Sequence, residues 1–211
     1  MRHGGPRSWR VALAGLGAAL LLSGCAVGSA KKDGDEDAVP RPEWRVGDRW
    51  VFQRTLASGQ AVVVTHQVTE ADGSGYTVRI AGPAPEITWR WTPELHLSRL
   101  ARGSEVLSRF EPAAMYFVWP LILGKEWSQE FDYRDGRRDG RYTNRWQVGA
   151  QIERVHTLAG SFYAVRIERW GSRGERVDTY WYSPRVRYWV RLESYANGYA
   201  EELVEFRIST S

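Results

Sequence analysis

Hydrophobic and polar residues alternate in short runs from residue 44 to the end of the chain. Tyr76, Val78 and Ile80 share one parity in one run, and Trp127 and Phe131 share one parity in another. Successive side chains of a β-strand point to opposite faces, so this period of two predicts strands with one buried and one solvated face. No run with the spacing of an amphipathic helix competes with this pattern.

Turn sequences separate these runs about every ten residues. Asp72-Gly73, Asp139-Gly140 and Asn197-Gly198 are typical, because Asp-Gly and Asn-Gly favour the positive φ angles of tight hairpins. We predict an all-β domain over residues 44–211 with about 10–13 antiparallel strands. A sheet of this length must curl or close, so we expect a curved sheet or a half-open β-barrel.

Two features interrupt the regular pattern. Residues 112–124 are apolar, do not alternate and contain two prolines, which predicts a crossover or a plug between two halves of the domain. In addition, the sequence Gly-Asp-Arg-Trp at 47–50 is echoed by Gly-Lys-Glu-Trp at 124–127. We predict that each copy opens one half of the domain, as an ancient duplication would produce.

The strand phase divides the tryptophans into two groups. Trp50, Trp127 and Trp146 alternate with polar neighbours and are predicted to face inward. Trp170 and Trp189 fall on the polar phase of their strands and are predicted to face outward.

Residues 177–193 form a predicted hairpin around Ser183-Pro184. Its phase predicts that Trp181 faces inward, together with Val177 and Thr179, and that Tyr180 and Tyr182 face outward. On the outer face, Trp189 stands between Arg187 and Arg191, within reach of cation–π contacts. The candidate ligand or partner site therefore consists of Trp189, Trp170, Arg187 and Arg191.

The N-terminus has the three parts of a bacterial export signal. Three arginines precede an apolar run at 11–22, which is too short to cross a bilayer as a helix. Leu22-Ser23-Gly24-Cys25 follows and resembles the lipobox of bacterial lipoproteins. This resemblance implies cleavage before Cys25, a diacylglycerol on its sulfur and a further acyl chain such as palmitate on the new amino group. Two or more acyl chains anchor a protein stably.

Residues 25–43 are predicted to be the lipidated cysteine and a flexible tether, after a signal peptide at 1–24. Acidic residues at 33, 35 and 37 match the start of a calcium loop, but Ala38 and Trp44 occupy the positions that need Gly and Glu. Because Ala26, and not Asp, follows Cys25, the outer membrane is favoured over the inner membrane.

Charge and cysteine content exclude several functions. Without the three arginines of the signal, the basic and acidic residues of the chain nearly balance, so nucleic-acid binding lacks its electrostatic basis. Cys25 is the only cysteine, so its acylation leaves no thiol for disulfides, zinc thiolates or a cysteine nucleophile. We expect no metal and no cofactor.

No catalytic motif is recognisable in the sequence. The histidines of the domain are scattered singly, and His66 shares a face with valines, which predicts an interior histidine with satisfied hydrogen bonds. The C-terminal glutamates alternate with arginines and are predicted to form a solvated ladder with cross-strand pairs. These are Glu193, Glu201, Glu202 and Glu205.

The segments at 120–127, 158–167 and 179–186 resemble an uncharacterised family of bacterial periplasmic proteins and lipoproteins with a domain of unknown function. Its members have Gly-Lys-x-Trp, Ala-Gly-Thr-Phe and Tyr-Ser-Pro turns, and the resemblance covers roughly 44–208. Ser161 replaces the usual Thr, and Arg187 replaces the usual Gly. The resemblance implies a curved sheet or half-open barrel, similar to Lol-type carriers that hold acyl chains against a concave face.

The sequence thus predicts a membrane-anchored envelope lipoprotein that is not an enzyme. Its β-domain is predicted to bind an apolar, lipid-like ligand or an envelope protein. One alternative is a glycan-binding or peptidoglycan-binding module that presents exposed aromatic rings. Another is a hydrolase with an unrecognised site, which would need two converging carboxylates.

Overall fold

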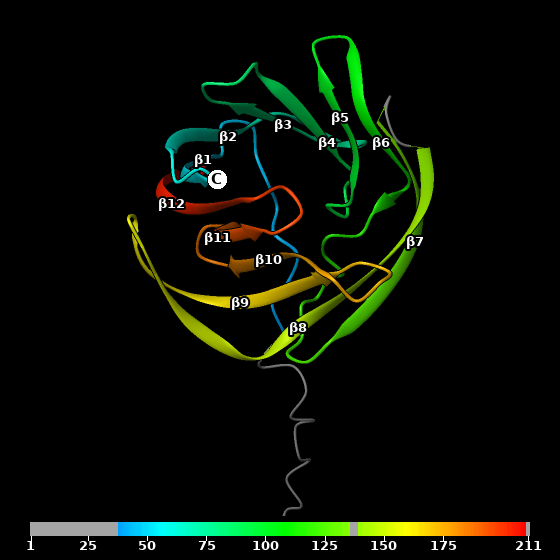
Figure 1. Ribbon diagram of the computed structural model, residues 1–211. Helices are drawn as coiled ribbons and strands as arrows, with labels where there is room; N and C mark the ends of the chain where they lie inside the picture. Colours follow the sequence, from blue (N-terminus) through cyan, green and yellow to red (C-terminus); the bar gives the residue numbers. More distant parts are fainter. Residues whose placement is uncertain (1–37, 136–138, 210–211) are drawn as a thin grey trace, which may run out of the picture. The chain divides into compact units, whose positions relative to one another are not determined.

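Twelve antiparallel strands form one closed barrel in the computed structural model, which describes residues 38–135 and 139–209 (Figure 1). The predicted signal peptide, Cys25 and most of the tether lie outside these residues. Within the described part of the chain, no helix is long and apolar enough to span a membrane. The prediction of an all-β fold is confirmed, and pairing of the first and last strands decides the closure that the sequence left open.

Each strand pairs with its neighbours in the sequence, and β1 also pairs with β12. The strands are β1 (Arg49–Leu56), β2 (Ala61–Asp72), β3 (Gly75–Ala81), β4 (Ile87–Trp91), β5 (Leu97–Arg102), β6 (Glu105–Ala114), β7 (Glu126–Arg134), β8 (Asp139–Thr157), β9 (Gly160–Trp170), β10 (Arg176–Ser183), β11 (Tyr188–Ser194) and β12 (Tyr199–Arg207).

An aromatic core fills part of the barrel interior. The Trp50 ring stacks on the Tyr188 ring with centroids 4.2 Å apart, and Trp44 contacts both rings. The indole nitrogens of Trp44 and Trp50 donate to the carbonyls of Arg187 and Val186, in the turn between β10 and β11. The segment before β1 and the start of β1 are therefore fixed to the β10–β11 turn by both packing and hydrogen bonds.

Residues 115–125 leave the sheet between β6 and β7 and enter the barrel, as the plug prediction requires. The Tyr116 ring contacts Trp91 of β4 and Tyr180 of β10, two strands that are not neighbours. Leu121 is buried and exchanges backbone hydrogen bonds with Val39. Val39, which lies within the predicted tether, therefore packs against the plug.

The two echoed sequences occupy equivalent places in the two halves of the barrel. Gly47 and Gly124 both have positive φ angles, of 96° and 75°, in turns that directly precede β1 and β7. In both turns the amide after the glycine donates across the turn, from Asp48 to Arg45 and from Lys125 to Ile122, at 3.0 Å. Each of the two similar sequences thus stands at the start of a set of six strands, β1 to β6 and β7 to β12.

Two irregularities overturn the phase predicted for the β10–β11 hairpin. The register slips between Trp181 and Tyr182, so that Trp181 lies opposite Arg191 while Tyr182 lies opposite Trp189. A second slip, between Arg176 and Asp178, puts Val177 out of phase with the rest of β10. A β-bulge adds one residue to one strand, so the regular alternation of the two faces is interrupted at that point.

The outward placement of three aromatic residues is therefore wrong. Trp189, Tyr180 and Tyr182 have exposed fractions of 1%, 5% and 2%. The inward placement of Trp50 and Trp146 is confirmed, since both are fully buried. Half-buried Trp127 stacks on Trp146 with an interplanar angle of 9°.

Candidate functional site

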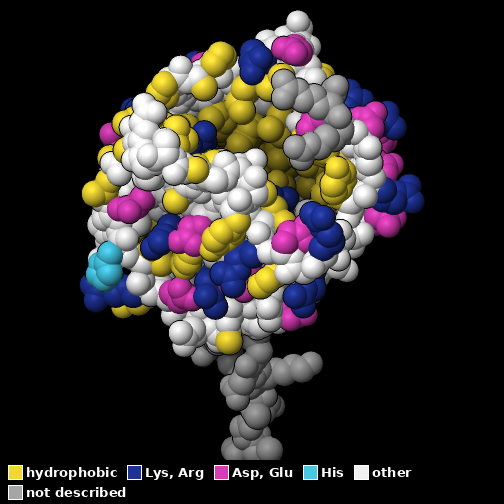
Figure 2. All heavy atoms as spheres, in the orientation of Figure 1, with side chains coloured by type: hydrophobic (Ala, Val, Ile, Leu, Met, Phe, Trp, Pro, Cys, Tyr) yellow, Lys and Arg dark blue, Asp and Glu magenta, His cyan; other side chains and the backbone are white. Residues whose placement is uncertain are grey.

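A cavity of about 840 Å³ lies inside the barrel and opens to solvent. Figure 2 shows its mouth as a hollow lined by hydrophobic side chains. Ligand pockets for small molecules commonly have volumes of about 300–1,000 Å³, so the cavity is large enough for a ligand of that size.

One wall of the cavity is apolar and comes from the first half of the barrel. Strands β3 to β6 provide it, and Ser108 is their one polar side chain among the described lining residues. Isoleucine, leucine, tryptophan and phenylalanine alternate there with outward polar residues, as the sequence pattern predicts. The apolar wall consists of Ile80, Ile87, Trp89, Trp91, Leu97, Leu100 and Phe110.

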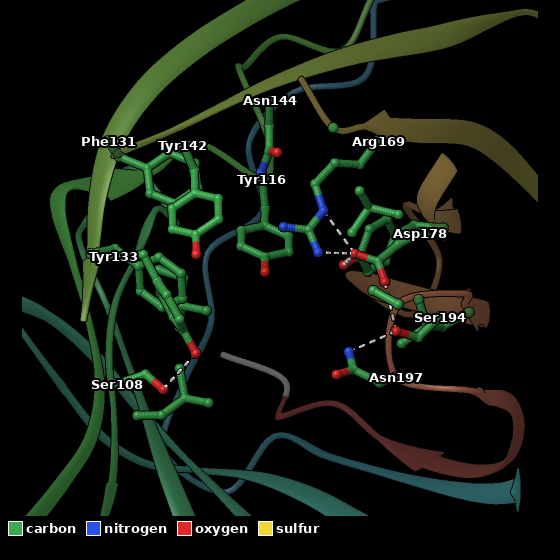
Figure 3. A pocket seen from close by; sticks show the side chains of 18 of the residues that line it. Ser108, Tyr116, Phe131, Tyr133, Tyr142, Asn144, Arg169, Asp178, Ser194 and Asn197 are labelled. Atoms are coloured by element: carbon green, nitrogen blue, oxygen red, sulfur yellow. Dashed lines mark hydrogen bonds and ion pairs between the residues drawn. The ribbon is translucent and has the colours of Figure 1, made fainter. Parts of the chain in front are cut away.

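The facing wall carries hydrogen-bonding groups and comes from the second half (Figure 3). It is formed by β8 to β11 and by the turn between β11 and β12. Tyrosine rings from both halves, including Tyr116 of the plug, lie between the two walls. The polar wall consists of Thr143, Asn144, Arg169, Asp178, Ser194 and Asn197.

An ion pair between Arg169 and Asp178 organises the polar wall. The Arg169 Nε donates to Asp178 Oδ2 at 2.7 Å, and its Nη2 donates to the same oxygen. Tyr180 donates to Oδ2 at 3.0 Å, and Ser194 donates to Oδ1 at 2.7 Å. Burial raises the pKa of the Tyr180 hydroxyl well above its ordinary value, so this group stays protonated and can donate. The buried carboxylate is therefore fully hydrogen-bonded.

A second ion pair joins Arg54, which lines the cavity, to Glu201 behind it. The Arg54 Nε and Nη2 donate to Glu201 Oε1 at 2.9 and 2.5 Å, and the Trp189 indole donates to Oε2 at 3.1 Å. Burial raises the pKa of the Glu201 carboxyl, while Arg54 opposes this shift. Glu201 is 1% exposed, so its assignment to a solvated ladder is wrong.

The ladder prediction is confirmed for Glu205, which is exposed and pairs with Arg49 across the β1–β12 contact, at 2.9 Å. Glu193 is half-buried and pairs with Arg191 of its own strand β11 at 2.6 Å, so this ion pair is not the predicted cross-strand pair.

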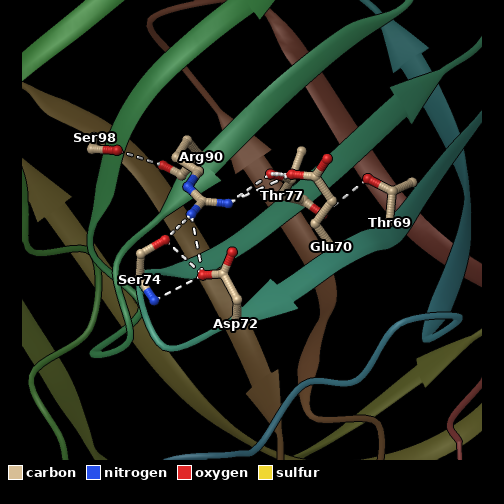
Figure 4. Close-up of polar contacts among 7 residues, drawn as sticks. All are labelled: Thr69, Glu70, Asp72, Ser74, Thr77, Arg90 and Ser98. Carbon is tan, nitrogen blue, oxygen red and sulfur yellow. Dashed lines mark hydrogen bonds and ion pairs between the residues drawn. The ribbon is translucent and has the colours of Figure 1, made fainter.

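The outer face of β2 to β4 carries ordinary solvated ion pairs of this kind (Figure 4). There Arg90 lies 3.7 Å from the Glu70 carboxylate and 3.4 Å from the Asp72 carboxylate, and both acids are exposed. Thr77 accepts from Arg90 at 2.9 Å and donates to Glu70 at 2.7 Å. These ion pairs lie on the solvated face of the sheet, so each contributes little to the free energy of unfolding.

His66 is fully buried, in agreement with its predicted interior position. Its Nδ1 lies 3.2 Å from the Tyr188 hydroxyl, and its Nε2 lies 3.7 Å from Glu201 Oε1. Burial, with a contribution from Arg54, holds the pKa of His66 well below its ordinary value. The imidazole is therefore neutral at physiological pH. Only one of its two nitrogens has a hydrogen-bond partner among the described residues, so the expected full satisfaction is not met.

The four residues of the candidate partner site do not form one site. Trp189 is buried against Tyr188, and Arg191 lies over the Trp181 ring at 5.0 Å and not over Trp189. Arg187 sits in the β10–β11 turn with a φ of 57°, the left-handed conformation that glycine adopts most easily, and donates to the Glu43 carbonyl. Arg187 therefore adopts a backbone conformation that glycine adopts more easily.

A tryptophan between two arginines does occur, but at Trp170. Arg176 lies 5.0 Å and Arg145 lies 5.9 Å from the centroids of this half-buried ring. Pairing of β9 with β8 and β10 produces this arrangement, since Trp170 lies directly opposite both arginines.

Sequence reasoning did not single out Arg169, Asp178 or Asn144. The sequence offers one signal for buried ion pairs, which is a charged residue close to aromatic residues on a strand. Asp178 precedes Tyr180 on β10, and Glu201 follows Tyr199 on β12. Such residues are rarely buried unless paired, so they mark interior ion pairs. Among the described residues, no group of three or more histidine, aspartate or glutamate side chains is arranged to hold a metal ion.

No family model matches this chain, and no curated protein matches it. Among solved structures, it is similar to a predicted exported protein with a YmcC-like fold from Bacteroides fragilis, with 15% identity, 81% of this chain and 99% of the other covered, and a TM-score of 0.38. A predicted lipoprotein from Parabacteroides distasonis has 17% identity, 82% and 100% coverage, and a TM-score of 0.38. The hypothetical lipoprotein YmcC from Escherichia coli has 7% identity, 75% and 84% coverage, and a TM-score of 0.41.

The family resemblance and the Lol-type similarity of the β-domain stay predictions.

Proposed function

We propose that this protein binds a lipid-like apolar ligand in the barrel cavity and is held at the cell-envelope membrane by acyl chains on Cys25. The observation that carries the proposal is the apolar wall of β3 to β6, which faces a solvent-open cavity of about 840 Å³. Apolar surface left in contact with water forgoes about 25 cal/mol per Å². A ligand with an apolar part would recover this free energy on binding.

The two buried carboxylates beside the cavity, Asp178 and Glu201, support a binding role over a catalytic one. Both Asp178 and Glu201 are committed to an arginine and to further donors. A hydrolase of the glycosidase type needs one carboxylate free to act as an acid and another free to act as a base or nucleophile. The proposed function is therefore non-enzymatic.

The structure does not support the glycan-binding alternative at the exposed ring that this alternative needed most, Trp189. That alternative required an exposed Trp189, and the structure buries that side chain. Trp170 remains half-buried, with both arginines beside it. The cavity is the larger and better-formed feature, so we favour the apolar ligand. For placement in the envelope, Ala26 supports the outer membrane.

The cavity proposal is tested by measuring the binding of a neutral apolar dye, N-phenyl-naphthylamine, to the chain carrying Cys25→Ser. This change removes the protein's own acyl chains, which would compete. Leu100→Trp puts a larger ring into the apolar wall and should weaken dye binding about tenfold, because it fills space that the dye needs.

Val63→Trp is the matched control, since Val63 is 60% exposed on β2 and does not line the cavity. It should leave the dye affinity unchanged, and melting curves check that both variants fold. Failure of the unmodified cavity to bind the dye, or equal effects of the two substitutions, would contradict the proposed function.

A further inference from the structure

We propose that the cavity selects an uncharged amphiphile, with its apolar part against β3 to β6 and its hydroxyl or carbonyl groups against the polar wall. This inference rests on the proposed function, because it specifies the ligand of the same cavity. It follows from how the charges of the cavity are compensated and from which polar groups remain.

The first interior cation is fully engaged. Arg54 forms two hydrogen bonds with Glu201, whose carboxylate is buried. The face of its guanidinium lies 4.4 Å from the centroid of the Tyr199 ring. A ligand anion near Arg54 would therefore compete with a carboxylate that cannot leave.

The second interior cation is engaged in the same way. Arg169 forms two hydrogen bonds with Asp178, and its guanidinium lies 4.9 Å from the centroid of the Tyr116 ring. Asp178 in turn accepts from Tyr180 and Ser194, so this carboxylate offers no free oxygen to a ligand cation. Each interior guanidinium thus has one carboxylate and one aromatic ring.

The mouth of the cavity adds one charge of each sign, from exposed Arg173 and exposed Glu175. Counting the paired Glu201, the charges of the described lining residues balance. A carboxylate or ammonium group that entered this cavity would lose its hydration without gaining an uncompensated partner. Charged head groups are therefore disfavoured inside.

Uncharged hydrogen-bonding groups remain on the polar wall. With its amide oxygen turned towards Arg169, Asn144 accepts from Nη1 at 3.3 Å and donates to the Thr143 carbonyl at 3.2 Å, which leaves it a second amide hydrogen. Asn197 donates to Ser194 at 2.9 Å, and its amide points towards the centre of the cavity (Figure 3). Amides can donate to and accept from hydroxyl and ester groups without any charge.

The inference is tested with three ligands that share a twelve-carbon chain: lauroylglycerol, laurate and dodecylammonium. Each displaces N-phenyl-naphthylamine from the Cys25→Ser chain. We expect lauroylglycerol to bind about tenfold more tightly than either charged ligand. Asn144→Leu should weaken lauroylglycerol binding about fivefold to tenfold, because one hydrogen-bonding partner is lost, and should weaken lauroylglycerol more than the dye, which forms no hydrogen bond there.

Gln151→Leu is the control, since Gln151 is an exposed residue of the same strand outside the cavity. Asn144→Asp adds one negative charge to the balanced lining and should tighten dodecylammonium binding. Laurate or dodecylammonium binding as tightly as lauroylglycerol in the unaltered cavity would overturn the charge selection and leave the apolar site standing. If neither the dye nor any of the three ligands bound, the proposed function itself would be wrong.

Discussion

Arg49 and Arg54 lie on the same strand, β1, and each pairs with a glutamate of β12. The two pairs differ in their surroundings. The Arg49–Glu205 pair has side chains that are 37% and 62% exposed, while those of Arg54 and Glu201 are 22% and 0% exposed. At residue scale, burial decides what an ion pair contributes, because an uncompensated charge is tolerated only in water.

Arg54→Met should lower the free energy of unfolding by about 3 kcal/mol, because it leaves the Glu201 carboxylate buried without its cation. Arg49→Met removes the exposed partner from the same strand and should cost less than about 1 kcal/mol. Urea unfolding of the two variants measures both values. If both variants lost a similar free energy of unfolding, burial would not make the Arg54–Glu201 pair contribute more than the Arg49–Glu205 pair.

His66 should make the stability depend on pH. Its pKa in the folded state lies well below the ordinary value, first because of burial and second because of Arg54, whereas the unfolded chain takes up a proton near about pH 6.5. Below that pH the unfolded state binds the proton and the folded state does not. The free energy of unfolding should therefore fall as the pH drops below about 6.5, by at most about 1.4 kcal/mol per pH unit.

Comparison with His66→Gln isolates this effect. Glu201 acts in the opposite sense, since its raised pKa lets the folded state bind a proton first. Urea unfolding from pH 7 to pH 5 should show a smaller loss of stability in His66→Gln than in the unaltered chain. Parallel pH profiles for the two proteins would contradict the argument.

At the scale of elements, the plug of residues 115–125 connects the core to the cavity. Lys125 donates from Nζ to the carbonyls of Val118 and Pro120, at 2.7 and 2.9 Å. Gln129 of β7 accepts from the Met115 amide and donates to the Ala113 carbonyl. The β6–β7 ladder itself has only three residue pairs, so these side chains replace part of the missing backbone ladder.

Lys125→Met should loosen the plug, because two carbonyl groups lose their donor. We expect the amide hydrogens of residues 115–124 to exchange about tenfold faster in hydrogen–deuterium exchange. Arg134→Met, at the exposed last position of β7, serves as the control and should leave this exchange unchanged. Exchange that stays as slow as in the unaltered chain would mean that packing of Phe117 and Leu121 alone holds the plug.

Attachment of the whole molecule to the membrane is predicted to depend on Cys25 near the N-terminus. Cys25 lies outside the described residues, and its acylation is predicted from the signal sequence. Cys25→Ser should move the protein from the membrane fraction to the soluble fraction and abolish incorporation of a clickable palmitate, because the acyl chains provide the anchor. Ser29→Ala, in the predicted tether, should change neither result. Membrane retention of the Cys25→Ser chain without palmitate would require another means of attachment.

The alternation of apolar and polar residues was sufficient to predict an all-β fold, the approximate number of strands and the burial of Trp50 and Trp146. It also located the interruption of the sheet, although the break predicted over 112–124 begins only after Ala114, the last residue of β6. These features depend on local periodicity and on turn residues, which each segment carries by itself. The outward placement of Trp189 was wrong because a bulge in the β10–β11 pair has no signature in that periodicity.

Only the tertiary structure decided the closure of the barrel and the composition of its cavity. Closure pairs Arg49 with Arg207, at opposite ends of the domain, and depends on the accumulated twist and stagger of all the strands. The polar wall likewise joins Arg169 of β9 to Asp178 and Ser194 through the pairing registers of β9, β10 and β11. The sequence by itself determined the strands and the turns between them, because these depend on the periodicity and turn residues of each segment. Which buried charges meet depends on registers between strands, which no single segment contains.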